Sequence, residues 1–328
     1  MATRPSELRA SVVIPTYRRV PLLLRCLQAL RQQVFDAQSF DVWVVDDGHC
    51  EETRRAVEAW AATHPQPVVH YLRPRQGRGP AVARNEGWRH AQAPVIAFTD
   101  DDTVPLRDWL DKGVWAMELT DAAALAGHVQ VPVSPRPTDH ERMTQGLEKA
   151  EFVTANAFVR RDALERVGGF DERFTRAWRE DSDLQFRLME VGSVGWYARA
   201  EVVHPVRQER WGISLRQQRN VFFDALLYKK HPQLYRERVM RHPPWGYYLT
   251  VALTLLTLWW AATGWTVAAQ LGAAGLLGGV LCFAWRRLRG ASHAPAHVAE
   301  MVVTSALIPF LSVYWRLRGA LHFRVLYW

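Results

Sequence analysis

The chain has 328 residues, with 41 lysines and arginines against 33 acidic residues and a formal net charge of +8 at pH 7. Its three cysteines lie far apart without a CxxC spacing, which argues against a disulfide framework or structural zinc and favours a reducing compartment. The positive charge suits anionic lipid, phosphorylated ligands or nucleic acid, but the basic residues do not cluster with aromatic ones, which disfavours nucleic acid.

Short apolar strands alternate with helices through the first hundred residues. Residues 1–10 lack the apolar core of a secretory signal, so we expect the first part of the chain to stay in the cytoplasm. Alternation of this kind predicts a parallel sheet wound by helices. The spacing predicts strands over 11–15, 40–45, 68–72 and 95–98, and helices over 21–31, 51–62 and 81–90.

Polar residues follow three of these strands, at Pro15–Tyr17, Asp46–Gly48 and Asp100–Asp102. In a parallel sheet these ends lie on one edge, where ligands collect. Three consecutive carboxylates repel one another, so folding does not favour them, whereas a hard divalent cation does. The alternative is a solvated turn, and Asp-Asp-Gly alone is more often a turn.

A glycine-rich loop, Gly77–Asn85, opens the third helix. Its start can face a phosphate, and Arg84 can act as a fixed cation there. The chain has neither a GxGxxG fingerprint nor a Walker lysine, which disfavours dinucleotide-dependent redox enzymes and P-loop enzymes.

Acidic residues also open a later amphipathic helix, in the segment Trp178–Leu184. Such residues commonly interact with the helix dipole alone. The functional alternative is that one of them faces the ligand and acts as a general base.

The second half of the chain contains 44 residues, 242–285, without Asp, Glu, Lys or Arg. This length is sufficient for two membrane spans with a turn at Thr263-Gly264. Arginines flank the stretch on both sides, which places both ends in the cytoplasm. The alternative is a buried helical hairpin of a soluble protein. Residues 297–315 are apolar but contain Glu300, so we expect an interfacial or re-entrant segment.

Seven segments between residues 10 and 220 resemble, in the right order, the signatures of family 2 glycosyltransferases with the GT-A fold. They are Ser11–Arg19, Val44–Gly48, Gly79–Gly87, Phe98–Thr103, Ala155–Arg160, Gly168–Phe174 and Glu180–Leu184. The resemblance implies a Rossmann-like, mostly parallel wound sheet. It also implies inverting transfer of a sugar from a nucleoside-diphosphate sugar to a hydroxyl, assisted by Mn²⁺ or Mg²⁺.

The resemblance assigns roles to individual residues by position. Asp100 and Asp102 match the two acids of the DXD motif, with Asp102 as the direct metal ligand and Asp101 beside the donor. Asp181 matches the catalytic base, with Glu180 and Asp183 as alternatives. The remaining assignments are Pro15, Tyr17 and Asp46 or Asp47 in the nucleoside pocket, Arg84 on the diphosphate, and His204 as a further metal or phosphate contact. His204 is otherwise an ordinary polar cap at a strand end.

We therefore expect four parts: a GT-A domain over 1–225, a linker over 226–244, a transmembrane hairpin over 245–290, and the interfacial or re-entrant segment over 291–328. The expected partners are a nucleotide-sugar, membrane lipids and a lipid-linked or cell-surface glycan acceptor at the cytoplasmic membrane face. The alternative is a non-catalytic nucleotide-sugar-binding subunit, which the presence of both Asp102 and Asp181 disfavours.

The segment Arg207–Trp211 resembles the QxxRW signature of processive polysaccharide synthases, with Arg207 in place of the glutamine. This difference favours a non-processive enzyme. Arg207, Arg210, Arg216 and Arg219 are alternatively a cationic wall near diphosphate or lipid phosphate.

Overall fold

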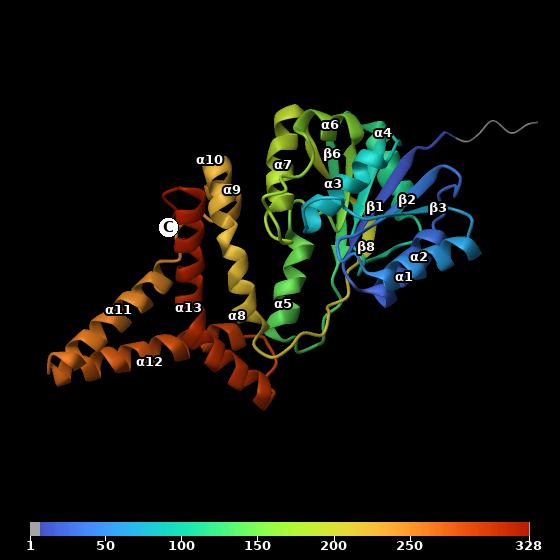
Figure 1. Ribbon diagram of the computed structural model, residues 1–328. Coiled ribbons are helices and arrows are strands. Elements are labelled where there is room, and N and C mark those ends of the chain that lie inside the picture. Colours follow the sequence, from blue (N-terminus) through green and yellow to red (C-terminus); the bar gives the residue numbers. More distant parts are fainter. Residues whose placement is uncertain (1–6, 328) are drawn as a thin grey trace, which may run out of the picture. The chain divides into compact units, whose positions relative to one another are not determined.

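The computed structural model describes residues 7–327 and divides into two units (Figure 1). The first unit consists of the residues up to Pro132 together with Gln145–Pro205, and the second of Val133–Thr144 together with the residues from Val206 on. Residues 1–6 and Trp328 lie outside the described range, so the prediction that residues 1–10 hold no secretory signal falls mostly on residues without a description.

The first unit contains a mixed sheet of eight strands in the order β3-β2-β1-β4-β7-β6-β8-β5. The strands from β1 to β4 are parallel, as predicted, whereas β7 runs antiparallel to both of its neighbours. β6 and β8 are again parallel, and β5 pairs antiparallel with β8. The strands are β1 (Ala10–Thr16), β2 (Phe40–Asp46), β3 (Val68–Leu72), β4 (Val95–Thr99), β5 (Val104–Pro105), β6 (Ala124–Gln130), β7 (Asn156–Arg160) and β8 (Val194–Val203).

Helices cover the sheet, which explains why its central strands are apolar runs without alternation. In β1 every residue except Pro15 is buried. One core cluster joins Phe98 of β4 to Trp88, Phe170 and Leu184. The helices of this unit are α1 (Val20–Arg31), α2 (Glu51–Thr63), α3 (Pro80–His90), α4 (Trp109–Leu119), a 3₁₀ turn (Gly146–Lys149), α6 (Arg161–Val167) and α7 (Glu180–Val191).

The close packing of α3 on the sheet depends on Gly87. A Cβ atom at this position would lie 2.4 Å from Cγ1 of Val13 and 3.1 Å from Cγ2 of Val45. The helix therefore approaches β1 and β2 closely, and this holds Arg84, one turn earlier, near the carboxyl ends of the parallel strands.

The second unit is helical. The segment 206–225 belongs to it because α8 and the following turn pack against α13, and the first unit ends at Pro205. The GT-A domain boundary expected at residue 225 stays a prediction. Its helices are α5 (Asp139–Gln145), α8 (Ile213–Gln217), a 3₁₀ turn (Gln218–Phe222), α9 (Asp224–Lys230), α10 (Pro232–Leu234), a π-helical turn (Tyr235–Val239), α11 (Trp245–Ala262), α12 (Thr266–Leu288) and α13 (Pro295–Phe323).

The predicted hairpin is present as α11 and α12, which pack against each other and are joined at Gly264 in a left-handed conformation (φ +83°) (Figure 1). Over its described length α11 buries no residue, and α12 buries only Gly272 and Ala284. Long apolar helices with so little burial have the composition of membrane helices.

Two described helices, α12 and α13, are long and apolar enough to cross a membrane. α11 is also uncharged, but its tryptophans and tyrosines lower its mean hydropathy. The segment 291–328, expected to be interfacial or re-entrant, forms a single 29-residue helix that continues through Pro309. The expected interfacial or re-entrant placement of this segment at a membrane stays a prediction.

If α12 lies in lipid, lysines on its exposed face will prevent its insertion. Leu277 and Leu281 are 61% and 51% exposed. A lysine at the centre of a span costs about 2.5–3.5 kcal/mol, so Leu277→Lys/Leu281→Lys is expected to move the protein out of the carbonate-washed membrane pellet. Leu119→Lys in α4, at a position that is 63% exposed, is the control and leaves the distribution unchanged. Equal retention of both variants would contradict the membrane assignment.

Candidate active site

The three consecutive aspartates after β4 have different environments. Asp101 is buried and accepts hydrogen bonds from Oγ1 of Thr16 (2.8 Å) and Nη1 of Arg19 (3.1 Å). Burial raises the pKa of Asp101, and the nearby Arg19 works against this. Asp101 therefore ties the end of β4 to the end of β1, and its place beside the donor stays a prediction.

Asp100 and Asp102 converge with His204, the residue that follows β8. One potential ligand atom from each of the three side chains lies within 4.8 Å of the others. Nε2 of His204 is 3.6 Å from Oδ1 of Asp102, and the His204 backbone N–H donates to the carbonyl of Gln130 at the end of β6 (2.8 Å). Two carboxylates and one imidazole nitrogen fit Mn²⁺ or Mg²⁺, since hard cations prefer oxygen ligands.

Arg84 is a buried cation surrounded by carboxylates. Its Nη2 donates to Oδ1 of Asp100 (2.8 Å), its Nη1 donates to Oε1 of Glu180 (3.2 Å), and only 3% of the residue is exposed. Although burial opposes ionisation, Arg84 lowers the pKa of Asp100. The guanidinium predicted to bind the diphosphate thus contacts two acids from distant segments, and the diphosphate contact stays a prediction.

The three acids at the start of α7 differ in how far their side chains are exposed. Glu180 is 2% exposed, and burial together with the neighbouring Asp181 raises its pKa to about 8, with Arg84 opposing the shift. Asp183 is fully buried and accepts two hydrogen bonds from Arg187 within the same helix (2.7 and 2.9 Å). Asp181 is partly exposed. Among the three, Asp181 is the acid accessible to a ligand.

Thr154 holds the Asp181 carboxylate at both oxygens. Its hydroxyl donates to Oδ1 (2.7 Å) and its backbone N–H donates to Oδ2 (3.2 Å). Burial raises the pKa of Asp181, while Arg84 and the bonds from Thr154 lower it. Thr154 is thus a site residue that the sequence did not reveal. Its position directly before the Ala155–Arg160 segment was the only signal.

The residues expected around the nucleoside lie at the ends of β1 and β2. Asp46 is buried and accepts hydrogen bonds from two backbone N–H groups and from the hydroxyl of Tyr71, at 2.7–2.9 Å. Oδ1 of Asp47 accepts the N–H of Gly79 (2.8 Å), and its Oδ2 receives no hydrogen bond from residues 7–327. Asp47 is therefore better placed than Asp46 to bind a ligand. Tyr17 is 51% exposed and Pro15 is partly exposed.

The glycine-rich loop that Asp47 holds needs glycine at position 79. Gly79 has φ +108°, and a Cβ atom there would lie 2.8 Å from the carbonyl oxygen of Thr175. No L-residue with a side chain fits this close approach without a shift. The loop therefore lies against the segment that leads into α7.

Comparison with known proteins matches residues 11–170 to the profile of glycosyl transferase family 2, and residues 95–286 to that of glycosyl transferase family group 2. The glycosyltransferase AglE of Haloferax volcanii is 27% identical over 199 residues, 58% of this chain and 60% of that protein. The validoxylamine A glucosyltransferase of Streptomyces hygroscopicus is 29% identical over 283 residues, 69% of this chain and 62% of that protein. The chain thus spans about three fifths of these relatives.

Among solved structures, the mannosyltransferase PcManGT from Pyrobaculum calidifontis, in complex with GDP-Man and Mn²⁺, is similar with a TM-score of 0.61. The match has 22% sequence identity and covers 96% of this chain and 90% of that one. At this identity the likeness concerns the fold, and it supports the predicted GT-A architecture of the mixed sheet.

The raised pKa of Glu180 has a consequence for stability. A carboxyl whose folded pKa is raised stabilises the fold fully below its unfolded pKa, and this contribution is lost as the pH rises toward its folded value of about 8. Glu180→Gln removes the titrating carboxyl. In cation-free buffer, the melting temperature of this variant is therefore expected to fall less between pH 5 and pH 8 than that of the wild type. Glu190→Gln, exposed on the same helix, is the control. Identical profiles for all three proteins would contradict the burial argument.

Proposed function

The chain belongs to the family 2 glycosyltransferases, and we propose that it transfers a sugar from a nucleoside-diphosphate sugar to an acceptor hydroxyl. The observation that carries this proposal is the convergence of a cation-ligand set, Asp100, Asp102 and His204, with an accessible carboxylate, Asp181. The two groups are neighbours because Arg84 binds Asp100 on one side and Glu180 on the other.

The first part of the chemistry is stabilisation of the leaving group. The departing nucleoside diphosphate gains negative charge as the glycosidic bond breaks, and a bound divalent cation offsets that charge. Asp100, Asp102 and His204 would hold the cation. The neighbouring cation Arg19, with Nη1 3.9 Å from Asp102, limits repulsion among the acids. The GDP-Man and Mn²⁺ in the PcManGT complex support a donor and a cation of this kind.

The second part is activation of the acceptor. A hydroxyl attacks efficiently only when a base takes its proton, and Asp181 is the accessible carboxylate beside the cation-ligand set. A double displacement would need a second carboxylate as nucleophile. Glu180 and Asp183 are both buried, and their oxygens accept hydrogen bonds from arginines, which makes them poor nucleophiles. This supports single displacement with inversion.

We further propose that transfer takes place at the cytoplasmic membrane face, onto a lipid-linked or cell-surface glycan acceptor. Support comes from α12 and α13 as candidate spans. Three arginines precede α11, and three more lie in the last turn of α12 or directly after it. The positive-inside tendency places both of these arginine groups in the cytoplasm. They are Arg236, Arg238, Arg241, Arg286, Arg287 and Arg289.

Substitutions of the base and of a cation ligand should separate transfer from binding. Asp181→Asn is expected to keep the thermal stabilisation by nucleotide-sugar and Mn²⁺ but to lose transfer by about 10²–10⁴-fold, the typical contribution of a general base. Asp102→Asn is expected to lose the Mn²⁺-dependent stabilisation itself. The measurements are thermal shift over a panel of nucleotide-sugars and turnover with the best donor, with the exposed Asp162→Asn as control.

Full turnover by Asp181→Asn would remove the base assignment. Wild-type protein that binds a donor, yet neither transfers nor hydrolyses its sugar, would instead indicate a non-catalytic nucleotide-sugar-binding subunit.

The two hydrogen bonds from Thr154 to Asp181 predict a shift in the pH profile. Thr154→Val keeps the shape and the backbone bond but removes the hydroxyl bond, which stabilises the ionised base. The pKa of Asp181 rises further, so the acid limb of kcat against pH is expected to move to higher pH and kcat to fall. Arg84, Asp100 and Glu180, the charged groups near Asp181, are unchanged. Thr154→Ser restores the bond and the wild-type profile. Identical profiles for both variants would exclude this positioning role.

A further inference from the structure

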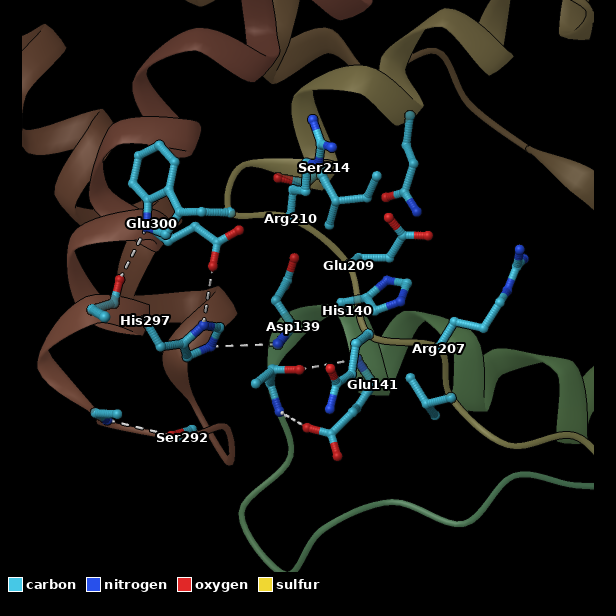
Figure 2. A pocket seen from close by; sticks show the side chains of 18 residues that line it. Asp139, His140, Glu141, Arg207, Glu209, Arg210, Ser214, Ser292, His297 and Glu300 are labelled. Carbon is cyan, nitrogen blue, oxygen red and sulfur yellow. Dashed lines mark hydrogen bonds and ion pairs between the residues drawn. The ribbon is translucent and has the colours of Figure 1, made fainter. Parts of the chain in front are cut away.

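The second unit contains a cavity of about 550 Å³ that the proposed chemistry does not use (Figure 2). Its lining comes from three segments: Thr138–Glu141 at the start of α5, residues from 206 to 217 before and within α8, and residues from 292 to 300 around the start of α13. This volume is in the range of small-ligand sites.

An arginine of α12, with a side chain that is only 10% exposed, holds two of these segments in place. Arg287 donates to both carboxylate oxygens of Asp139 (2.6 and 3.3 Å) and to the hydroxyl of Ser214 (3.2 Å). It also donates to the hydroxyls of Thr304 (2.6 Å) and Ser305 (3.2 Å) in α13. These bonds use all five donors of the guanidinium. The walls are therefore preorganised, which lowers the entropic cost of binding a ligand.

Most acidic groups of the lining are engaged by the protein itself. Asp139 is paired with Arg287, and Glu141 accepts two backbone N–H groups (2.7 and 3.1 Å) as the cap of α5. Glu300 accepts the backbone N–H of Gly212 (2.7 Å). Their negative charges are thus offset by local donors, and they contribute little repulsion toward an anion in the cavity.

The cations of the lining lie on the segment before α8. Arg207 and Arg210 have exposed side chains, and Glu209 is the one acid of this segment; Figure 2 shows all three at the cavity. Arg210 forms no ion pair with an acid among residues 7–327. Guanidinium groups bind phosphate in bidentate geometry, so this wall favours a phosphate-bearing ligand.

The cavity lies close in the chain to the end of a candidate span. α12 ends at Leu288, and Ser292, Ala294 and Ala296 already line the cavity. Trp211, 55% exposed, donates its indole N–H to the carbonyl of Ala296 (3.3 Å). An exposed tryptophan with a bonded N–H is typical of the membrane–water interface, the depth at which lipid headgroups lie.

We infer that this cavity binds the phosphate-bearing headgroup of a lipid-linked acceptor, with Arg207 and Arg210 as its cationic contacts. This inference rests on the proposed function and names its acceptor class. Free phosphate has the same charge chemistry, but a cavity a few residues from a span favours the lipid as its source.

The probe is dodecyl phosphate, titrated into the full chain in an uncharged polyoxyethylene detergent, with inorganic phosphate as a parallel probe. The wild type is expected to bind dodecyl phosphate. The double variant Arg207→Gln/Arg210→Gln is expected to bind dodecyl phosphate more weakly than the wild type by roughly tenfold or by a larger factor, because two charge-assisted contacts are lost. Arg216→Gln removes an exposed arginine of α8 that does not line the cavity, and it should bind like the wild type.

Equal binding by the double variant and the wild type, or an equal loss in Arg216→Gln, would overturn the inference. Inorganic phosphate binding as tightly as dodecyl phosphate would overturn the lipid source. Stabilisation by nucleotide-sugar and Mn²⁺ is measured on the same proteins and should be unchanged in the double variant. If nucleotide-sugar and Mn²⁺ do not stabilise the wild type, this result counts against the proposed function and not against the inference that the cavity binds a lipid phosphate.

Discussion

The candidate site depends on one buried guanidinium. Arg84 contacts Asp100 from the end of β4 and Glu180 from the start of α7, two segments that are 80 residues apart in the chain. Buried carboxylates without a cation would repel one another at a large cost in free energy. The approach of α3 to the sheet, which Gly87 permits, delivers this cation to the strand ends. The acids proposed to hold a metal and the acid proposed to accept a proton can therefore occupy one region.

Neighbouring acids in the sequence acquire different chemistry from their surroundings. Asp101 is bonded to Thr16 and Arg19, while Asp102 lies beside His204. Glu180 is buried against Arg84, whereas the next residue, Asp181, is partly exposed. Burial favours the neutral form and a paired cation favours the charged form. The proposed division of roles between cation ligands and general base therefore rests on packing, because all of these carboxylic acids have the same functional group.

In the second unit, too, a single arginine joins segments that are distant in the chain. Arg287, at the end of α12, joins α5, α8 and α13 through hydrogen bonds that leave no donor unused. It connects the walls of a polar cavity to a helix whose leucines are exposed over most of its length. Such a helix is at low free energy when lipid surrounds it. In the proposal, the membrane therefore surrounds the exposed leucines of α12 and also supplies the lipid phosphate that the cavity binds.

The sequence by itself determined the alternation of strands and helices, the shared edge of the strand ends, the order of the family's segments and the uncharged hairpin. These features depend on local periodicity and composition, which the chain carries directly. Only the tertiary structure decided that β7 runs antiparallel, that the first unit ends at Pro205, that Asp46 is engaged by the protein, and that Thr154 holds Asp181. Each of these depends on a partner distant in the chain, and such partners follow from packing and leave no local pattern.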